Sequence, residues 1–326
     1  MSDEVTQYME NGHAFMAAED YTNALAEYNR ALATDSASDY AWYCKGCVFT
    51  ELRSYREAID CYKQALAINP DHALPWYNMG VAHQELHESD DALNCFNKSI
   101  EIAPDFADAW INLGRLLEDD GQWAMAVACY KQALERQPDD WIALVNLGNC
   151  YKHLGELAEA VTSFKSALRL EPTNPEALYG LAETLYEQQQ TKEALTVINT
   201  CVTHHPSWMP AWALQAFLHA ELEQPNKALA AIDTALRLES NPILWNNKAE
   251  ILAKLGEEKS SEEAIDNALE MAPDYLPAIF SKARFLINRN EFKEAEKLCQ
   301  TYIDTAPEDD EQLPSVHDML QQCRNR

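Results

Sequence analysis

Glycine, positive charge and long apolar runs are all scarce in this sequence. Only nine of the 326 residues are glycine, and they form no Gly-rich loop of the kind that cradles a phosphate group. The longest apolar stretches are too short to span a bilayer. Lysine and arginine number 25 against 53 acidic residues, which gives a net charge of −28. Such a chain repels phosphate backbones and anionic lipid, so the composition disfavours nucleic-acid and membrane-surface binding.

Cysteine occurs nine times, but in no arrangement that suggests disulfides. The count is odd, and Cys61, Cys95 and Cys129 recur at one fixed spacing. Equivalent atoms of stacked repeats lie about 10 Å apart, whereas a disulfide needs Cα atoms within about 7 Å. The first residues contain neither the basic segment nor the apolar segment of a secretory signal. These features predict reduced thiols and a cytoplasmic location.

A period of 34 residues runs along the chain. The stretch at residues 41–71, AWYCKGCVFTELRSYREAIDCYKQALAINPD, has close echoes at residues 75–105 and 109–139. A fixed period in this range indicates stacked helical repeats, which grow in one dimension and need no single central core. The nine predicted repeats are residues 5–38, 39–72, 73–106, 107–140, 141–174, 175–208, 209–241, 242–275 and 276–309.

Each repeat has a small residue in its first half and an apolar residue sixteen places later. Glycine inside a helix costs about 1 kcal/mol relative to alanine, so its recurrence predicts that two helices approach closely there. We expect the alanine twelve places later, such as Ala58, to be the other side of this contact, and the apolar residue to fill the space toward the neighbouring repeat. Polar turns between these places and prolines at most repeat ends predict a helical hairpin in each repeat. The small residues are Gly12, Gly46, Gly80, Gly114, Gly148, Ala182, Ala216, Ala249 and Ala283. Their apolar counterparts are Tyr28, Tyr62, Phe96, Tyr130, Phe164, Ile198, Ile232, Ile265 and Cys299.

Aspartates follow several of the closing prolines. A side chain of this type accepts hydrogen bonds from the first free amides of a helix and interacts favourably with its dipole. We therefore predict that these aspartates cap the following helices. They are Asp71, Asp105, Asp139 and Asp274.

The repeat resembles a known family. Its pattern is carried by Trp42, Gly46, Phe49, Ala58, Tyr62, Ala65 and Pro70, and it resembles the tetratricopeptide repeat. The resemblance implies an all-α, right-handed superhelical solenoid of about nine hairpins that forms a single array over residues 1–326. A helix at about 311–324, with apolar residues at helical spacing, is predicted to cover the last repeat. In this family the first helices of the repeats line a concave groove that usually binds extended peptides or helices of other proteins.

The groove is where we expect the partner-binding residues. Asparagine stands two places before the small residue in several repeats, and its amide can pair with both groups of an extended peptide backbone. Aromatic side chains on such a wall are typical anchors for a partner. The same wall has more acidic than basic residues, which favours a basic partner segment, extended or helical. The predicted partner-binding residues are Asn78, Asn112, Asn146, Asn149, Asn247, Tyr43, Tyr77, Tyr179, Arg115 and Glu183.

A C-x-x-C motif, Cys44-Lys45-Gly46-Cys47, is the one candidate for chemistry. A metal site would need a second ligand pair, and a redox site would need a thiol at a helix N-terminus. The sequence has no second such motif, and Gly46 already belongs to the packing register. No Ser/His/Asp or Cys/His arrangement follows from spacing. We therefore predict no catalytic residue, no metal and no cofactor.

These observations predict a non-enzymatic adaptor or scaffold that binds another protein. Two alternatives stay open. One is a scaffold that self-associates through the more degenerate repeats six to nine. The other is an enzyme that uses Cys44 or Cys47, or a repeat module of a larger enzyme.

Overall fold

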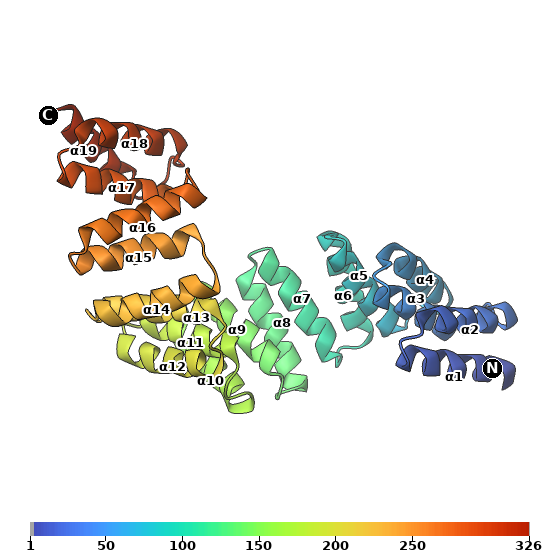
Figure 1. The fold of residues 1–326 in the computed structure, drawn as a ribbon. Helices are drawn as coiled ribbons and strands as arrows, with labels where there is room; N and C mark the ends of the chain where they lie inside the picture. Colours follow the sequence, from blue (N-terminus) through green and yellow to red (C-terminus); the bar gives the residue numbers. More distant parts are fainter. Residues whose placement is uncertain (1–2, 326) are drawn as a thin grey trace. The chain divides into compact units, whose positions relative to one another are not determined.

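Every regular element in the computed structural model is an α-helix across residues 3–325, the part of the chain that the structure describes (Figure 1). By internal contacts the chain divides into two compact parts, an N-terminal half (Met1–Leu170) and a C-terminal half (Glu171–Arg326). No helix among residues 3–325 is long and apolar enough to cross a membrane.

The helices of the N-terminal half are α1 (Asp3–Ala17), α2 (Tyr21–Thr34), α3 (Asp39–Glu51), α4 (Tyr55–Ile68), α5 (Ala73–Glu85), α6 (Ser89–Ile102), α7 (Ala107–Asp119), α8 (Trp123–Arg136), α9 (Trp141–His153) and α10 (Leu157–Leu170). Those of the C-terminal half are α11 (Pro175–Glu187), α12 (Thr191–His204), α13 (Met209–Glu221), α14 (Pro225–Leu238), α15 (Pro242–Lys254), α16 (Glu258–Met271), α17 (Leu276–Asn288), α18 (Phe292–Thr305) and α19 (Leu313–Arg324).

The helices pair as hairpins, one pair to each predicted repeat. Each odd-numbered helix from α1 to α17 packs most extensively on the helix that follows it. The last helix, α19, packs on α18 and α17, and it buries Val316 and Leu320 beside Tyr302 and Cys323 beside Leu286. The all-α tetratricopeptide fold with a helix covering its last hairpin is therefore confirmed.

The glycine register is explained by the ring sixteen residues later. A Cβ atom at Gly46 would lie 2.4 Å from the ring of Tyr62, and one at Gly114 would lie 2.8 Å from the ring of Tyr130. Both rings are completely buried. Thus the aromatic ring itself fills the contact between the two helices and leaves no room for a side chain. Where alanine replaces the glycine, in repeats six to nine, an isoleucine or Cys299 replaces the ring.

The turn inside each hairpin contains one residue in the left-handed region. Three of these residues are glycines, which have no Cβ to clash with the backbone. The other six have side chains that disfavour this conformation. The residues are Glu19, Arg53, His87, Gly121, Gly155, Gln189, Glu223, Gly256 and Asn290, with φ between 55° and 79°.

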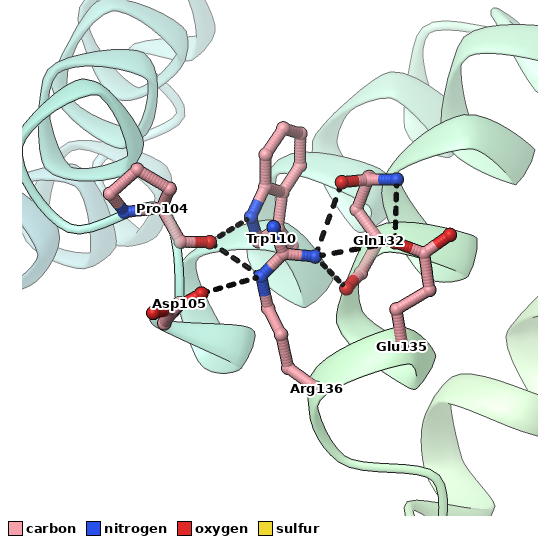
Figure 2. Close-up of polar contacts among 6 residues, drawn as sticks. All are labelled: Pro104, Asp105, Trp110, Gln132, Glu135 and Arg136. Atoms are coloured by element: carbon pink, nitrogen blue, oxygen red, sulfur yellow. Dashed lines mark hydrogen bonds and ion pairs between the residues drawn. The ribbon is translucent and has the colours of Figure 1, made fainter.

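Several turns between repeats are closed by a tryptophan. Figure 2 shows Trp110, whose indole nitrogen donates to the carbonyl of Pro104 at 3.0 Å. Arg136 of α8 donates to the same carbonyl at 2.6 Å, and its guanidinium lies 5.7 Å from the centre of the Trp110 ring. The indole bond recurs between Trp76 and Pro70 at 3.0 Å. The tryptophan of the repeat pattern therefore ties the start of one repeat to the end of the preceding one.

The predicted helix caps were wrong by one residue. In the Asn69–His72 turn the amide of His72 donates to the carbonyl of Asn69, which makes His72, not Asp71, the N-cap of α5. Phe106 takes the same place at α7, so Asp105 precedes the cap. Asp139 and Asp274 likewise precede the N-caps, which are Asp140 and Tyr275. Side-chain caps occur where this later place holds serine, aspartate or asparagine, as at Ser38, Asp140, Asn174 and Asn241, whereas the side chain of His72 forms none.

Candidate partner-binding face

The first helices of neighbouring repeats contact one another. In the N-terminal half this joins α3 to α5, α5 to α7, and α7 to α9. We call the surface along these four helices the first-helix face. It is defined by seven of the ten predicted partner-binding residues, namely Tyr43, Tyr77, Asn78, Asn112, Arg115, Asn146 and Asn149.

Two tyrosine–asparagine pairs cross from one repeat to the next on this face. The amide nitrogen of Asn112 donates to the Tyr77 hydroxyl at 2.8 Å, and that of Asn78 donates to the Tyr43 hydroxyl at 3.3 Å. The partners are 35 residues apart in both pairs. This separation is one residue more than the period of 34. The sequence therefore contains a signal for the pairs, namely a tyrosine with an asparagine 35 residues later. That signal was not used in the prediction.

These pairs determine what the asparagines can offer to a partner. Asn112 also donates to the carbonyl of Asp108 at 3.0 Å, and Asn78 also lies 3.5 Å from the sulfur of Cys47. An asparagine amide has two hydrogens, and in both residues both are directed at neighbours within the chain. Only the amide oxygen of each remains for a partner, so neither can pair with both groups of a peptide backbone.

The asparagines of α9 differ from the two before them. Ile111 stands where a tyrosine would contact Asn146, and the side chains of Asn146 and Asn149 form no hydrogen bond with any residue between 3 and 325. Both side chains are half-buried. Arg115 on the neighbouring helix α7 is exposed and forms no ion pair with a residue that the structure describes. Donors and acceptors are therefore both accessible at the α7–α9 junction.

Aromatic rings line the α3 end of the face. Tyr43 is stacked on Tyr40, with ring centres 6.1 Å apart, and it contacts His72 at 5.5 Å. Tyr77 meets Phe106 edge-on at 4.8 Å. Tyr40 is 42% exposed, so this cluster presents an aromatic surface beside the tyrosine–asparagine pairs.

The other three predicted residues lie in the C-terminal half. Tyr179 of α11 contacts Trp208 edge-on at 5.5 Å, and burial together with the carboxylate of Glu183 raises the pKa of Tyr179. Asn247 of α15 lines a depression of about 180 Å³ between α13 and α15. The structure therefore places Tyr179 next to Glu183 on one helix and Asn247 on another.

The C-x-x-C motif lies inside α3, away from the helix ends. Cys44 is buried, with its sulfur 3.6 Å from the Nε2 atom of His13, and burial raises the pKa of the Cys44 thiol to about 12. Burial also raises the pKa of Cys47. A thiol reacts and binds metals as its thiolate, so this environment opposes both functions. All nine cysteines are free.

A second candidate for metal binding is the group of His83, Glu88 and Asp91, whose ligand atoms lie within 4.8 Å of one another. Glu88 already accepts from Arg56 at 3.1 Å and pairs with the Nδ1 atom of His83 at 2.7 Å. The hydrogen bonds from His83 and Arg56 lower the pKa of Glu88. Because Arg56 already neutralises Glu88, these side chains are better explained as a polar network between α4, α5 and the start of α6 than as a cation site.

Comparison with known families identifies the class of protein. Residues 4–205 match the family model of the cilia and flagella-associated protein 70 C-terminal domain. Residues 214–275 and 252–319 each match a tetratricopeptide repeat model. The chain is thus a tetratricopeptide repeat protein. Because the first match covers more than half of its residues, the chain belongs to the family of the cilia and flagella-associated protein 70 C-terminal domain. No curated protein matches the sequence significantly.

Solved structures share the fold at low sequence identity. Yeast Tom70 is 12% identical, with 98% of this chain and 96% of that chain covered and a TM-score of 0.55. PilF of Pseudomonas aeruginosa is 20% identical, with 68% and 98% covered and a TM-score of 0.57. YrrB, described as a TPR protein with an unusual peptide-binding site, is 21% identical, with 60% and 97% covered and a TM-score of 0.53. The fold is typical of protein-interaction scaffolds.

Proposed function

We propose that the chain is a non-enzymatic scaffold that binds an extended or helical segment of a partner protein along its first-helix face. The observation that carries this proposal is the α7–α9 junction. There the unpaired amides of Asn146 and Asn149 lie one repeat away from Asn112, whose donors are fixed by Tyr77 and Asp108. A partner segment would therefore find a hydrogen-bond acceptor at Asn112 on α7, and both donors and acceptors at Asn146 and Asn149 on α9.

The partner segment is basic. The chain has a net charge of −28, and the face includes exposed carboxylates such as Glu85 and Asp108. A basic segment approaching this surface is attracted over a Debye length, about 10 Å at 0.1 M salt. The aromatic cluster of Tyr40, Tyr43 and His72 supplies apolar area for an anchor.

The state of the cysteines supports a cytoplasmic, non-catalytic protein. All nine are free and most are buried, as expected in a reducing compartment. The raised pKa of the Cys44 thiol opposes nucleophilic catalysis at neutral pH. The peptide-binding description of YrrB, which has the same fold, agrees with the proposed activity.

The proposal is tested by selecting ligands from a phage-displayed library of random 16-residue peptides on the full-length chain at 50 mM salt. We expect the enriched sequences to be rich in lysine and arginine. Their affinity should weaken when the salt concentration rises to about 300 mM, because the Debye length then falls well below 10 Å. Failure to enrich any sequence, or enrichment of acidic sequences with salt-independent binding, would overturn the proposal.

A further inference from the structure

Two depressions on the C-terminal half occupy the same place in successive repeats. The first, about 180 Å³, lies between α13 and α15, and the second, about 150 Å³, lies between α15 and α17. Ile232 of α14 lines the first and Ile265 of α16 lines the second, and these residues are repeat equivalents. A cavity of about 150 Å³ accommodates a benzene ring, so each has room for one leucine or phenylalanine side chain.

The depressions follow from the same pairing that governs the core. In repeats one to five, a buried aromatic ring covers the glycine of the first helix, as Tyr62 covers Gly46. In repeats seven and eight the pairs are Ala216 with Ile232 and Ala249 with Ile265. An isoleucine is shorter than a phenol ring and does not reach as far toward the face. The space that the ring fills in the earlier repeats is therefore open here.

A small side chain lines both depressions at the same place in the repeat. Ala220 lines the first and Ala253 lines the second, again at equivalent places. One repeat earlier this place is occupied by Tyr186, whose ring meets Phe217 edge-on at 4.9 Å. The Tyr186 hydroxyl also donates to Glu221 at 3.3 Å, which holds that carboxylate at the rim of the first depression.

One carboxylate lies between the two depressions. Glu250 of α15 lines both of them, is exposed, and forms no ion pair with a residue that the structure describes. The cations at the rims, Lys254 and Arg284, each line only one depression. The chain has a net charge of −28, and this carboxylate has no partner within it. A partner with a basic side chain between its two apolar anchors would therefore complement the site.

The spacing of the depressions selects a helical partner. Adjacent packed helices are about 10 Å apart, and a helix rises about 10.5 Å over seven residues, which brings residues i and i+7 to the same side. Residues i+3 and i+4 then lie between them on that side. In an extended strand, the residues on one side are about 7 Å or 13 Å apart, so a strand fits the two depressions poorly.

We propose that α13, α15 and α17 bind one amphipathic helix of a partner protein, with apolar side chains at i and i+7 in the two depressions and a lysine or arginine at i+3 or i+4 against Glu250. This inference rests on the proposed function, because it specifies one partner class and its register for a chain that binds protein segments.

The test uses fluorescence anisotropy with the full-length chain and two alanine-based, fluorescein-labelled 21-residue peptides. The first has phenylalanine at positions 8 and 15 and arginine at position 12. The second has the same composition, but its second phenylalanine is moved to position 13, on the other side of the helix. We expect the first peptide to bind at least tenfold more tightly. Equal affinities, or no binding of either peptide at 1 mM, would overturn the proposal.

Variants locate the binding. Ala220→Leu with Ala253→Leu fills both depressions and should weaken the first peptide at least tenfold, and Glu250→Lys should weaken it about fivefold to tenfold. Ala128→Leu and Glu270→Lys, at exposed places on second helices, serve as matched controls and should leave the affinity unchanged. Thermal unfolding of each variant verifies the fold, and Glu250→Lys, which alters only an exposed side chain, retains the test if the leucine variant unfolds.

Two results would reject the helix while leaving the proposed function intact. In one, selected peptides bind through Asn146 and Asn149 and the designed helix does not bind. In the other, sedimentation shows self-association that the leucine variant abolishes, which would make a second copy of the chain the occupant. Insensitivity of the designed helix to both the leucine variant and Glu250→Lys would also contradict the assignment.

Discussion

Asn112 of α7 donates a hydrogen bond of 2.8 Å to the hydroxyl of Tyr77 on α5, and this bond joins two successive repeats at the candidate binding face. The asparagine therefore has a structural role as well as a proposed binding role. Asn146, one repeat further along, has the same place in its repeat but no such bond. The two residues should consequently respond differently to substitution.

We predict that Asn112→Ala lowers the stability of the chain by about 1 kcal/mol, the net contribution of a typical intramolecular hydrogen bond. Tyr77→Phe should have a similar effect because it removes the acceptor of the same bond. Asn146→Ala is the matched control and should leave the urea unfolding midpoint unchanged. Equal destabilisation by Asn112→Ala and Asn146→Ala would show that the Tyr77 bond contributes nothing measurable.

We also predict that Gly46→Ala destabilises the chain by about 1–3 kcal/mol, the usual effect of overpacking a core. The added Cβ would lie 2.4 Å from the Tyr62 ring, so that ring must move. In a Tyr62→Ile background, which reproduces the alanine–isoleucine pairs of the later repeats, the same substitution should have a much smaller effect. Urea unfolding of the four chains of this double-mutant cycle measures the coupling, and additive effects would contradict the assigned contact.

The sequence was sufficient to predict the repeat, its hairpins and the covering helix, because these depend on local periodicity. Gly46 was correctly identified as a place where two helices approach closely, but the side chain that faces it is the Tyr62 ring and not the predicted Ala58. The N-caps were misplaced because the turn after each proline needs one more residue, as His72 shows by its bond to Asn69. The sequence reading also missed the Tyr77–Asn112 bond, which depends on how neighbouring repeats are stacked and not on any single repeat. The single array and the roles of the ten site residues stay predictions.

A turn residue gives a third prediction. Glu223 has a φ of 55°, a conformation that glycine adopts without steric strain and that Gly121, Gly155 and Gly256 adopt at the equivalent place. We expect Glu223→Gly to raise the stability by about 0.5–1 kcal/mol, since relief of strain exceeds the entropic penalty of glycine. The matched control is Gly256→Ala, which should lower the melting temperature. A lower melting temperature for Glu223→Gly would contradict the prediction.

The Cys44 thiol gives a prediction on pH. Its pKa of about 12 in the folded chain lies well above the value of about 8.5 for a free cysteine. At pH 8.5 iodoacetamide should therefore alkylate Cys44 far more slowly in the native chain than in urea, as measured by peptide mass spectrometry. Because the folded state favours the neutral thiol, this group's contribution to stability is present below about pH 8.5 and is lost as the pH rises further. Rapid alkylation of the native chain at pH 7 would indicate a reactive thiol instead.

The central claim is that a partner segment binds along the first-helix face, and the most direct measurement compares affinities at the α7–α9 junction. The probe is the tightest peptide from the phage selection, titrated into the full-length chain and into Asn146→Ala/Asn149→Ala. Loss of two hydrogen bonds of about 1 kcal/mol each predicts a decrease of about 30-fold in affinity, with an unchanged melting temperature. Asn97→Ala, an exposed asparagine on the second helix of its repeat, should bind like the unmodified chain. Equal affinity for the double variant and the unmodified chain would contradict the account.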